Sequence, residues 1–240
     1  MVFARITWFI AALAVVPAAL SLGCRTQRMR AAAPVPAVPH GFVAARRVSP
    51  LFDPALAPTR LDTKERDRWQ QPARIVAALH LSRGQTVADI GTGSGYLLPY
   101  LSHAVGPHGS VIAEEVQEEF LPALRRRARE LHNIQVTLGA IEDPKLSVRD
   151  VAAFVLLTVY HEVDRPVDFL ANLRKYAAPG ARLAIIDFDK SRKGSPPAPV
   201  GHEISEAAVI QEANAAGWEL AARHEFIPSQ FYLVFRQQRR

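Results

Sequence analysis

The chain has 240 residues, of which 49% are apolar and 22% charged, a composition that fits a globular protein and excludes a disordered one. Its formal net charge of +6 belongs to residues 1–60, which hold seven arginines and one acid, whereas residues 61–240 hold 22 basic and 22 acidic side chains. The neutral globular part does not favour nucleic-acid binding, and the basic N-terminal part points to an anionic membrane surface as its partner.

The N-terminal segment, residues 1–24, is predicted to be a signal or anchor. Residues 6–22 are almost wholly apolar, a length that fits a signal-peptide core or a short spanning helix. The stretch ends at Cys24, the only cysteine of the chain, and residues 20–24 resemble the lipobox of bacterial lipoproteins. Three arginines in residues 25–30 favour the alternative, an uncleaved inner-membrane anchor with a cytoplasmic domain.

Residues 25–61 are predicted to be an extended tether, because proline at their density blocks helix and ladder hydrogen bonds. Residues 62–240 are predicted to be one domain in which helices and strands alternate, a pattern typical of a parallel sheet with helices on both faces. Strands are expected at 86–90, 111–115, 133–138, 154–159, 182–188, 218–226 and 230–236. Helices are expected at 64–80 with a break at Pro72, and at 96–103, 118–131, 165–177 and 203–216.

A glycine-rich turn follows the first expected strand, with glycines at positions 91, 93 and 95. Glycine lets the backbone approach a ligand, and the next helix would offer amide groups to an anionic group. A dinucleotide-binding turn would need glycine at 96, where Tyr96 stands. The spacing instead matches a turn that cradles the aminoacyl end of S-adenosylmethionine. Glu115, 20 residues past Gly95, is predicted to accept the ribose hydroxyls, with Glu114 as the alternative.

Residues 65–236 resemble a bacterial subfamily of class I S-adenosylmethionine-dependent methyltransferases, distantly similar to the quinone-biosynthesis C-methyltransferases. The resemblance implies an α/β, Rossmann-like doubly wound fold, with a seven-stranded, mostly parallel sheet and an antiparallel last strand. It implies S-adenosyl-L-methionine as cofactor but does not supply the methyl acceptor, which we expect to be an unidentified small molecule. The motifs that carry it lie at residues 69–72, 87–96, 160–162, 178–180, 201–202 and 232–235. The predicted cofactor-binding residues are Asp89, Gly91, Thr92, Gly93, Gly95, Glu115 and Glu142.

Three positions depart from the family's pattern, since Ala140, Ala152 and Thr158 stand where relatives carry acids. Glu142 or Asp143 is expected to replace the acid missing at 140, which contacts the adenine amine in the family. These departures motivate an alternative function, a non-catalytic cofactor-binding lipoprotein of the envelope. A nicotinamide-dependent oxidoreductase is disfavoured by Tyr96 and by the expected terminal pair of strands.

The catalytic candidates are Tyr160 and His161, which follow the fourth expected strand, where open α/β sheets place their ligands. Because histidine suits proton transfer near neutral pH, His161 is a candidate base or substrate-orienting residue. The alternative is a residue that hydrogen-bonds the loop backbone and caps the next helix. Asp187 and Asp189 end the fifth expected strand at the same rim, where such acids are more often solvated. No metal site is expected, because the eight histidines show no pair at ligand spacing and a thiolate zinc site is excluded. The sequence identifies neither the acceptor nor the oligomeric state.

Overall fold

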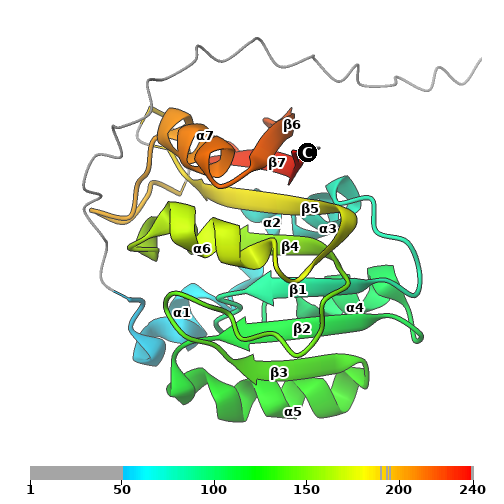
Figure 1. Ribbon diagram of the computed structural model, residues 1–240. Helices are drawn as coiled ribbons and strands as arrows, with labels where there is room; N and C mark the ends of the chain where they lie inside the picture. Colours follow the sequence, from blue (N-terminus) through cyan, green and yellow to red (C-terminus); the bar gives the residue numbers. More distant parts are fainter. Residues whose placement is uncertain (1–50, 190, 193, 195, 239–240) are drawn as a thin grey trace, which may run out of the picture.

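A computed structural model describes residues 51–189, 191–192, 194 and 196–238, which are coloured in Figure 1. The expected signal or anchor segment and the expected tether up to residue 50 lie outside the described residues. In the part of the chain that the structure describes, no helix has both the length and the apolar character needed to cross a membrane.

The described residues form a seven-stranded sheet in the order β3-β2-β1-β4-β5-β7-β6. The first five strands pair in parallel, and β7 runs antiparallel between β5 and β6, which confirms the predicted fold class. The strands are β1 Thr86–Ile90, β2 Ser110–Glu115, β3 Ile134–Leu138, β4 Val151–Leu157, β5 Ala177–Phe188, β6 Trp218–His224 and β7 Gln230–Gln237.

Helices cover both faces of the sheet (Figure 1). One face packs against α3, α4 and α5, and the other packs against α6 and α7. The α-helices are α1 Ala57–Arg60, α2 Lys64–Gln70, α3 Pro72–Ala78, α4 Leu98–Val105, α5 Leu121–Leu131, α6 Pro166–Leu173 and α7 Glu206–Ala215. Three short 3-10 helices are η1 Pro54–Leu56, η2 Glu118–Phe120 and η3 Tyr160–Glu162.

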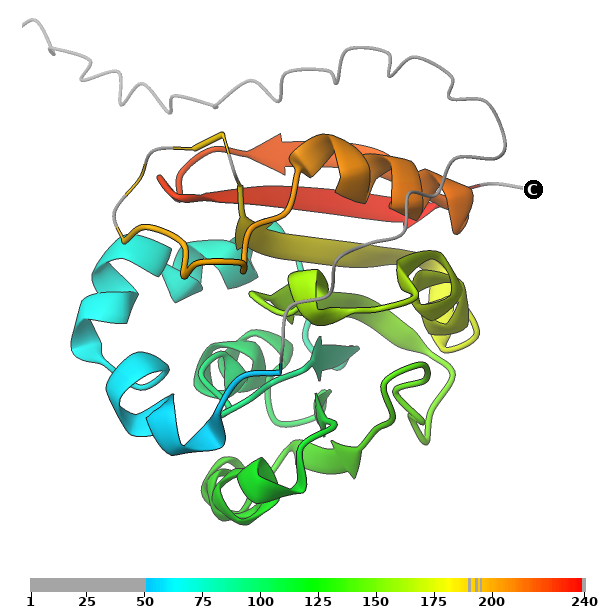
Figure 2. The same cartoon turned by 90° about the vertical axis from the view of Figure 1, so that its left-hand side faces the viewer.

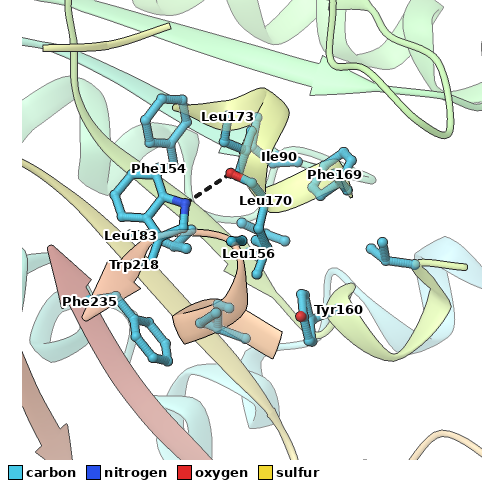
Figure 3. Packing of buried hydrophobic residues seen from close by; sticks show 14 of the residues in the cluster. Ile90, Phe154, Leu156, Tyr160, Phe169, Leu170, Leu173, Leu183, Trp218 and Phe235 are labelled. Atoms are coloured by element: carbon cyan, nitrogen blue, oxygen red, sulfur yellow. Dashed lines mark hydrogen bonds between the residues drawn. The ribbon is translucent and has the colours of Figure 1, made fainter. Parts of the chain in front are cut away.

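The central strand β4 explains how the two cores are separated. Phe154 faces the core under α6 and α7, whereas Val155 faces the core under α3, α4 and α5, as the two-residue period of a strand requires. Figure 3 shows Phe154 beside Trp218, whose indole nitrogen donates a 2.9 Å hydrogen bond to the carbonyl of Leu170. A strand that is apolar on both faces is therefore buried on both faces, as its sequence predicts.

Several boundaries differ from the sequence prediction, and two of them affect the argument. Strand β4 ends at Leu157 and not at residue 159, because Thr158 takes a positive φ of 61° that leaves the extended conformation. Helix α6 ends at Leu173, and Ala177 already pairs with Val151. Pro179 therefore lies within the irregular start of β5 and does not stop a helix.

The extended conformation expected of residues 51–61 is wrong for residues 54–60, which form η1 and α1. The Asp53 carboxylate accepts a 3.0 Å hydrogen bond from the amide of Ala55 and caps η1. Pro54 stands at the start of η1 and Pro58 in the first turn of α1, where the missing N–H of proline costs no helical hydrogen bond. Proline density therefore sets helix starts here and does not prevent helices. Figure 2 shows this segment, in blue, leading into α2 on the side of the domain where the parallel strands end.

Candidate functional site

A pocket of about 560 Å³ opens at the carboxyl ends of the parallel strands, the side that faces the viewer in Figure 2. It lies where the strand order reverses between β1 and β4, the position at which open α/β sheets bind ligands. Its walls come from the glycine turn after β1, the end of β2 and the loop after β4. Two further segments complete it, residues 51–61 and residues 196–202.

The glycine turn has three left-handed residues, since φ is +63° at Gly91, +56° at Gly93 and +82° at Gly95. Gly91 and Gly93 line the pocket, whereas Gly95, also expected to bind the cofactor, does not. A Cβ at Gly91 would lie 2.7 Å from Val159, and one at Gly95 would lie 2.7 Å from Leu98. At Gly93 the nearest atom would be a flexible Leu61 methyl at 3.3 Å. All three positions therefore need glycine for φ, and at Gly93 the only neighbour of an added Cβ would be the flexible side chain of Leu61.

Two residues beside this turn fix its shape. The Asp89 carboxylate accepts a 2.7 Å hydrogen bond from the Thr92 hydroxyl, and the Thr92 amide donates to the Glu114 carbonyl at 2.9 Å. Burial raises the pKa of Asp89 to about 7. Asp89 and Thr92 thus line the pocket, as the sequence predicts, and they also hold the end of β1 to the turn and to β2.

Glu115 presents a carboxylate at the pocket wall that three backbone amides hold in place. Its Oε2 accepts from Gly93 at 2.8 Å, and its Oε1 accepts from Val116 at 2.8 Å and Gln117 at 3.0 Å. Burial raises the pKa of Glu115, and these three amides oppose that shift because they favour the charged form. Oε1 thus already accepts two hydrogen bonds and Oε2 one, so a ligand would use the remaining acceptor position of Oε2, and a second ligand hydroxyl would share Oε1.

Glu114 also reaches the pocket, and its environment differs. Its Oε2 accepts from the Gly91 amide at 3.1 Å, while its Oε1 is buried with no hydrogen-bond partner among the described residues. Burial raises the pKa of Glu114 to about 8, and the nearby carboxylates of Glu115, Asp89 and Asp143 raise it further. Burial therefore favours the uncharged form of Glu114, whereas three backbone amides favour the charged form of Glu115.

Arg66 of α2 is a pocket residue that the sequence did not single out. Its side chain is buried, its guanidinium lies 3.9 Å from the centre of the Tyr96 ring, and Nη1 donates to the Leu61 carbonyl at 2.9 Å. Burial lowers the pKa of Arg66 to about 10, so it stays charged at neutral pH. The only sequence signal is its place just before the motif at residues 69–72.

A buried chain of amides ties α2 to the sheet and accounts for Thr158. Gln70 accepts from Arg66 at 2.5 Å and donates to Gln230 at 2.8 Å, and Gln230 donates to the Thr158 hydroxyl at 2.9 Å. Thr158, which stands where the family carries an acid, thus accepts a hydrogen bond from a residue of β7. Ala140 lines the pocket without a polar side chain, and Ala152 lies within β4.

His161 lies at the pocket wall in η3 and is held from behind by Asp187. Its Nδ1 is 2.8 Å from Oδ1 of Asp187, and its amide donates to Oδ2 at 3.0 Å. An ionised carboxylate only accepts hydrogen bonds, so Nδ1 carries the proton and Nε2 offers a lone pair. Asp187 is fully buried, which corrects the expectation of a solvated acid.

Tyr160, the other catalytic candidate, points away from the pocket. Its hydroxyl donates to Glu212 at 2.8 Å, and Figure 3 shows its ring within the core under α6 and α7. Neither Tyr160 nor Glu142 lines the pocket. Glu142 is exposed and pairs with Arg165 at 3.2 Å, so the structure does not bring it to the cofactor side as expected. The backbone of η3 turns between residues 160 and 161, so their side chains point in different directions.

The fold brings together three potential metal ligands, where the sequence predicts none. His161, Glu162 and His202 each offer one ligand atom, and these atoms lie within 4.8 Å of one another. His202 comes from the segment that covers the pocket, 41 residues further along the chain. Local spacing could not reveal this cluster, because the two histidines meet only when that segment folds over η3.

The comparisons with known proteins agree on one family. Residues 87–180 match the model of a methyltransferase domain. The crystal structure of an S-adenosylmethionine-dependent methyltransferase from Aquifex aeolicus superposes with a TM-score of 0.72 at 31% identity, covering 78% of this chain and 100% of that one. That structure spans the described domain, so the match extends to the whole fold.

Curated relatives match over shorter stretches. A ubiquinone/menaquinone biosynthesis C-methyltransferase from Pseudomonas fluorescens is 31% identical over 116 residues, which is 45% of this chain and 43% of that protein. A tRNA adenine N1-methyltransferase from Methanocaldococcus jannaschii is 44% identical over 52 residues, 22% of this chain and 18% of that protein. The chain thus spans less than half the length of the curated relatives it matches, and these two carry different acceptors in their names.

Proposed function

The chain belongs to the S-adenosylmethionine-dependent methyltransferases, and we propose that it transfers a methyl group from this cofactor to a small-molecule acceptor bound beside His161. The observation that carries the proposal is one pocket that holds both the glycine turn with Glu115 and the buried pair of His161 and Asp187. The first pair suits the cofactor, and the second suits an acceptor that must lose a proton.

The cofactor side is assigned from charge and shape. The open backbone at Gly93 admits the aminoacyl end, Glu115 accepts the ribose hydroxyls, and Arg66 binds the cofactor carboxylate as the buried cation of α2. Five carboxyl groups and two guanidinium groups line the pocket, a balance that suits the positive sulfonium. These acids are Asp53, Asp89, Glu114, Glu115 and Glu162.

The acceptor side is assigned from enclosure and from the histidine. Residues 51–61 and 196–202 cover the pocket with mainly apolar side chains, which suits a small molecule better than a polymer. The acceptor heteroatom attacks the methyl carbon, its new bond to carbon forms, and the carbon–sulfur bond breaks to release S-adenosylhomocysteine. An O–H or N–H proton passes to Nε2 of His161, and Asp187 stabilises the resulting imidazolium.

The experiment that tests this function separates binding from turnover. Calorimetric titration of the full chain with S-adenosylmethionine and with NAD measures cofactor choice, and transfer of a labelled methyl group to a panel of phenols, thiols and amines measures turnover. We expect S-adenosylmethionine alone to bind, and His161→Gln to keep binding while turnover falls about a hundredfold. The matched control is His108→Ala, an exposed loop histidine outside the pocket. Absence of S-adenosylmethionine binding would overturn the proposal.

Binding without turnover of any acceptor would instead favour the alternative, a non-catalytic cofactor-binding protein. Ala140 supports that alternative, since it leaves the pocket wall without the acid that the family carries there. Thr158 does not, because its hydroxyl is engaged by Gln230 at 2.9 Å.

We also propose that the protein is membrane-associated through residues 1–24, as a lipoprotein modified at Cys24. The support is the apolar stretch followed by the only cysteine of the chain. Metabolic labelling with a palmitate analogue is expected to fail in Cys24→Ser, with the domain accessible to protease in spheroplasts. An unlabelled protein with a protected domain would leave the cytoplasm-facing anchor as the better explanation.

A further inference from the structure

The cluster of His161, Glu162 and His202 has the geometry of a cation site. Nε2 of His161 lies 2.9 Å from Nδ1 of His202 and 3.7 Å from Oε1 of Glu162. Two ligand atoms at about 2.1 Å from one zinc ion are separated by roughly 2.9–3.4 Å, for ligand angles between square and tetrahedral. The two observed separations lie at or within a few tenths of an ångström of that range.

His161 is held by a carboxylate in the way that metal-binding histidines are. Asp187 accepts the Nδ1 proton at 2.8 Å, which fixes the ring and directs the Nε2 lone pair toward the other two side chains. Asp187 is itself held, because its Oδ1 accepts the amide of Phe188 at 2.9 Å. This carboxylate–histidine arrangement fixes the tautomer and raises the basicity of a ligand.

The surroundings favour a positive charge. Glu162 is largely buried, with 14% of its side chain exposed, and the fully buried carboxylate of Asp187 lies directly behind the neighbouring His161. Burying several carboxylates together is unfavourable unless a cation is near. The sulfonium of the cofactor supplies one such charge to the pocket, so the test must separate it from a metal ion.

We propose that His161, Glu162 and His202 bind a divalent transition-metal ion of the zinc type at the acceptor side of the pocket. Two imidazoles and one carboxylate select such ions over magnesium and calcium, and three protein ligands leave one coordination position open. All three residues line the pocket, so that position faces the space assigned to the acceptor. The site is argued from these ligands and does not depend on methyl transfer.

Nε2 of His161 can bind a metal ion or act as a base, but it cannot do both at once. A bound ion would take the Nε2 lone pair, and an acceptor hydroxyl or thiol on the ion would then lose its proton more readily. Without an ion, His202 donates its Nδ1 proton to Nε2 of His161, a hydrogen bond that also explains the 2.9 Å distance. The experiment distinguishes these two states.

The test uses the full chain, stripped with a chelator and dialysed against Zn(II), with metal content measured by mass spectrometry. We expect one equivalent per chain, with affinity at least tenfold weaker in His202→Ala and in Glu162→Gln. Exposed His108→Ala is the matched control and should bind as the parent does. Cys24→Ser, carried in parallel, separates this site from the lone thiol and should also bind as the parent does.

Co(II) titration adds a spectroscopic readout, since a four-coordinate site gives a strong visible band that His202→Ala should abolish. Zinc stoichiometry and affinity that are the same in both ligand variants and in the parent would overturn the proposal and leave the hydrogen-bonded pair. S-adenosylmethionine titration of the same samples keeps the two proposals separate. A protein that binds zinc but not this cofactor would contradict the proposed function alone, and the reverse result would contradict the metal site alone.

Discussion

Replacing Glu115 by Gln removes one negative charge from the pocket and changes the size of the side chain little. The carboxylate accepts three backbone amides in the free protein, from Gly93, Val116 and Gln117. An amide side chain has one acceptor oxygen, so it cannot satisfy donors on both sides. We therefore expect a modest loss of stability together with a larger loss of cofactor affinity.

The affinity change follows from the two ribose hydroxyls assigned to Glu115. A hydrogen bond to a charged group contributes about 1.5–3 kcal/mol, and a neutral one about 0.5–1.5 kcal/mol. Loss of the charge at two such bonds costs about 2 kcal/mol, or about thirtyfold in affinity. Glu114→Gln should change affinity by less than about threefold, because burial raises the pKa of Glu114 to about 8 and leaves it mostly uncharged.

Calorimetric titration with S-adenosylmethionine at pH 7 measures both variants, and thermal unfolding checks that each is folded. Glu118→Gln is the matched control, since it removes the same charge from an exposed residue three positions further on. A thirtyfold loss in Glu115→Gln with small changes in the other two variants is the expected pattern. Equal losses in Glu114→Gln and Glu115→Gln, or none in Glu115→Gln, would refute the assignment of the ribose contact.

Gly93→Val should abolish cofactor binding in a folded domain, because a β-branched residue at φ +56° costs about 1–2 kcal/mol and fills the pocket side; Gly84→Val, also at positive φ but in open space, is the calorimetric control. Arg66→Met should weaken the binding of S-adenosylmethionine at least tenfold, whereas the exposed control Arg68→Met should not. A cofactor analogue that lacks the carboxylate should bind the parent and Arg66→Met equally well. Unequal binding of this analogue would contradict the assigned contact. For Glu114 the native pKa of about 8 exceeds the ordinary 4.5, so its stabilising contribution is present at low pH and is lost as pH rises through 8. Chemical denaturation of the parent and of Glu114→Gln should therefore differ by up to about 1.4 kcal/mol per pH unit between pH 5 and 8, and parallel pH curves would contradict the raised pKa.

The sequence alone predicts the parts that depend on neighbours in the chain. Strand β1, the turn after it and Glu115 can be read locally, because glycine spacing and a two-residue apolar period act over a few positions. The order of elements then implies the parallel sheet, since a strand, a helix and the next strand form one right-handed unit. The seven strands and the antiparallel last strand were implied by the family resemblance, and the structure confirms them.

Tertiary structure decided what depends on contacts between distant segments. Asp187 and His202 meet His161 only because β5 lies beside β4 and because the covering segment folds over η3. Arg66 enters the pocket because α2 is tied by Gln70 to β7, 160 residues further along the chain. No local sequence pattern predicts these contacts, because each of these side chains, taken alone, could equally well lie in solvent.

The direction of single side chains is the other property that the sequence left open. Adjacent residues Tyr160 and His161 look equally catalytic in the motif, but a 3-10 turn sends the first into the core and the second to the pocket. Residues 54–60 look extended from their prolines, yet Asp53 and the first-turn positions of those prolines start two short helices. In both cases local composition permits more than one conformation, and tertiary packing selects among them.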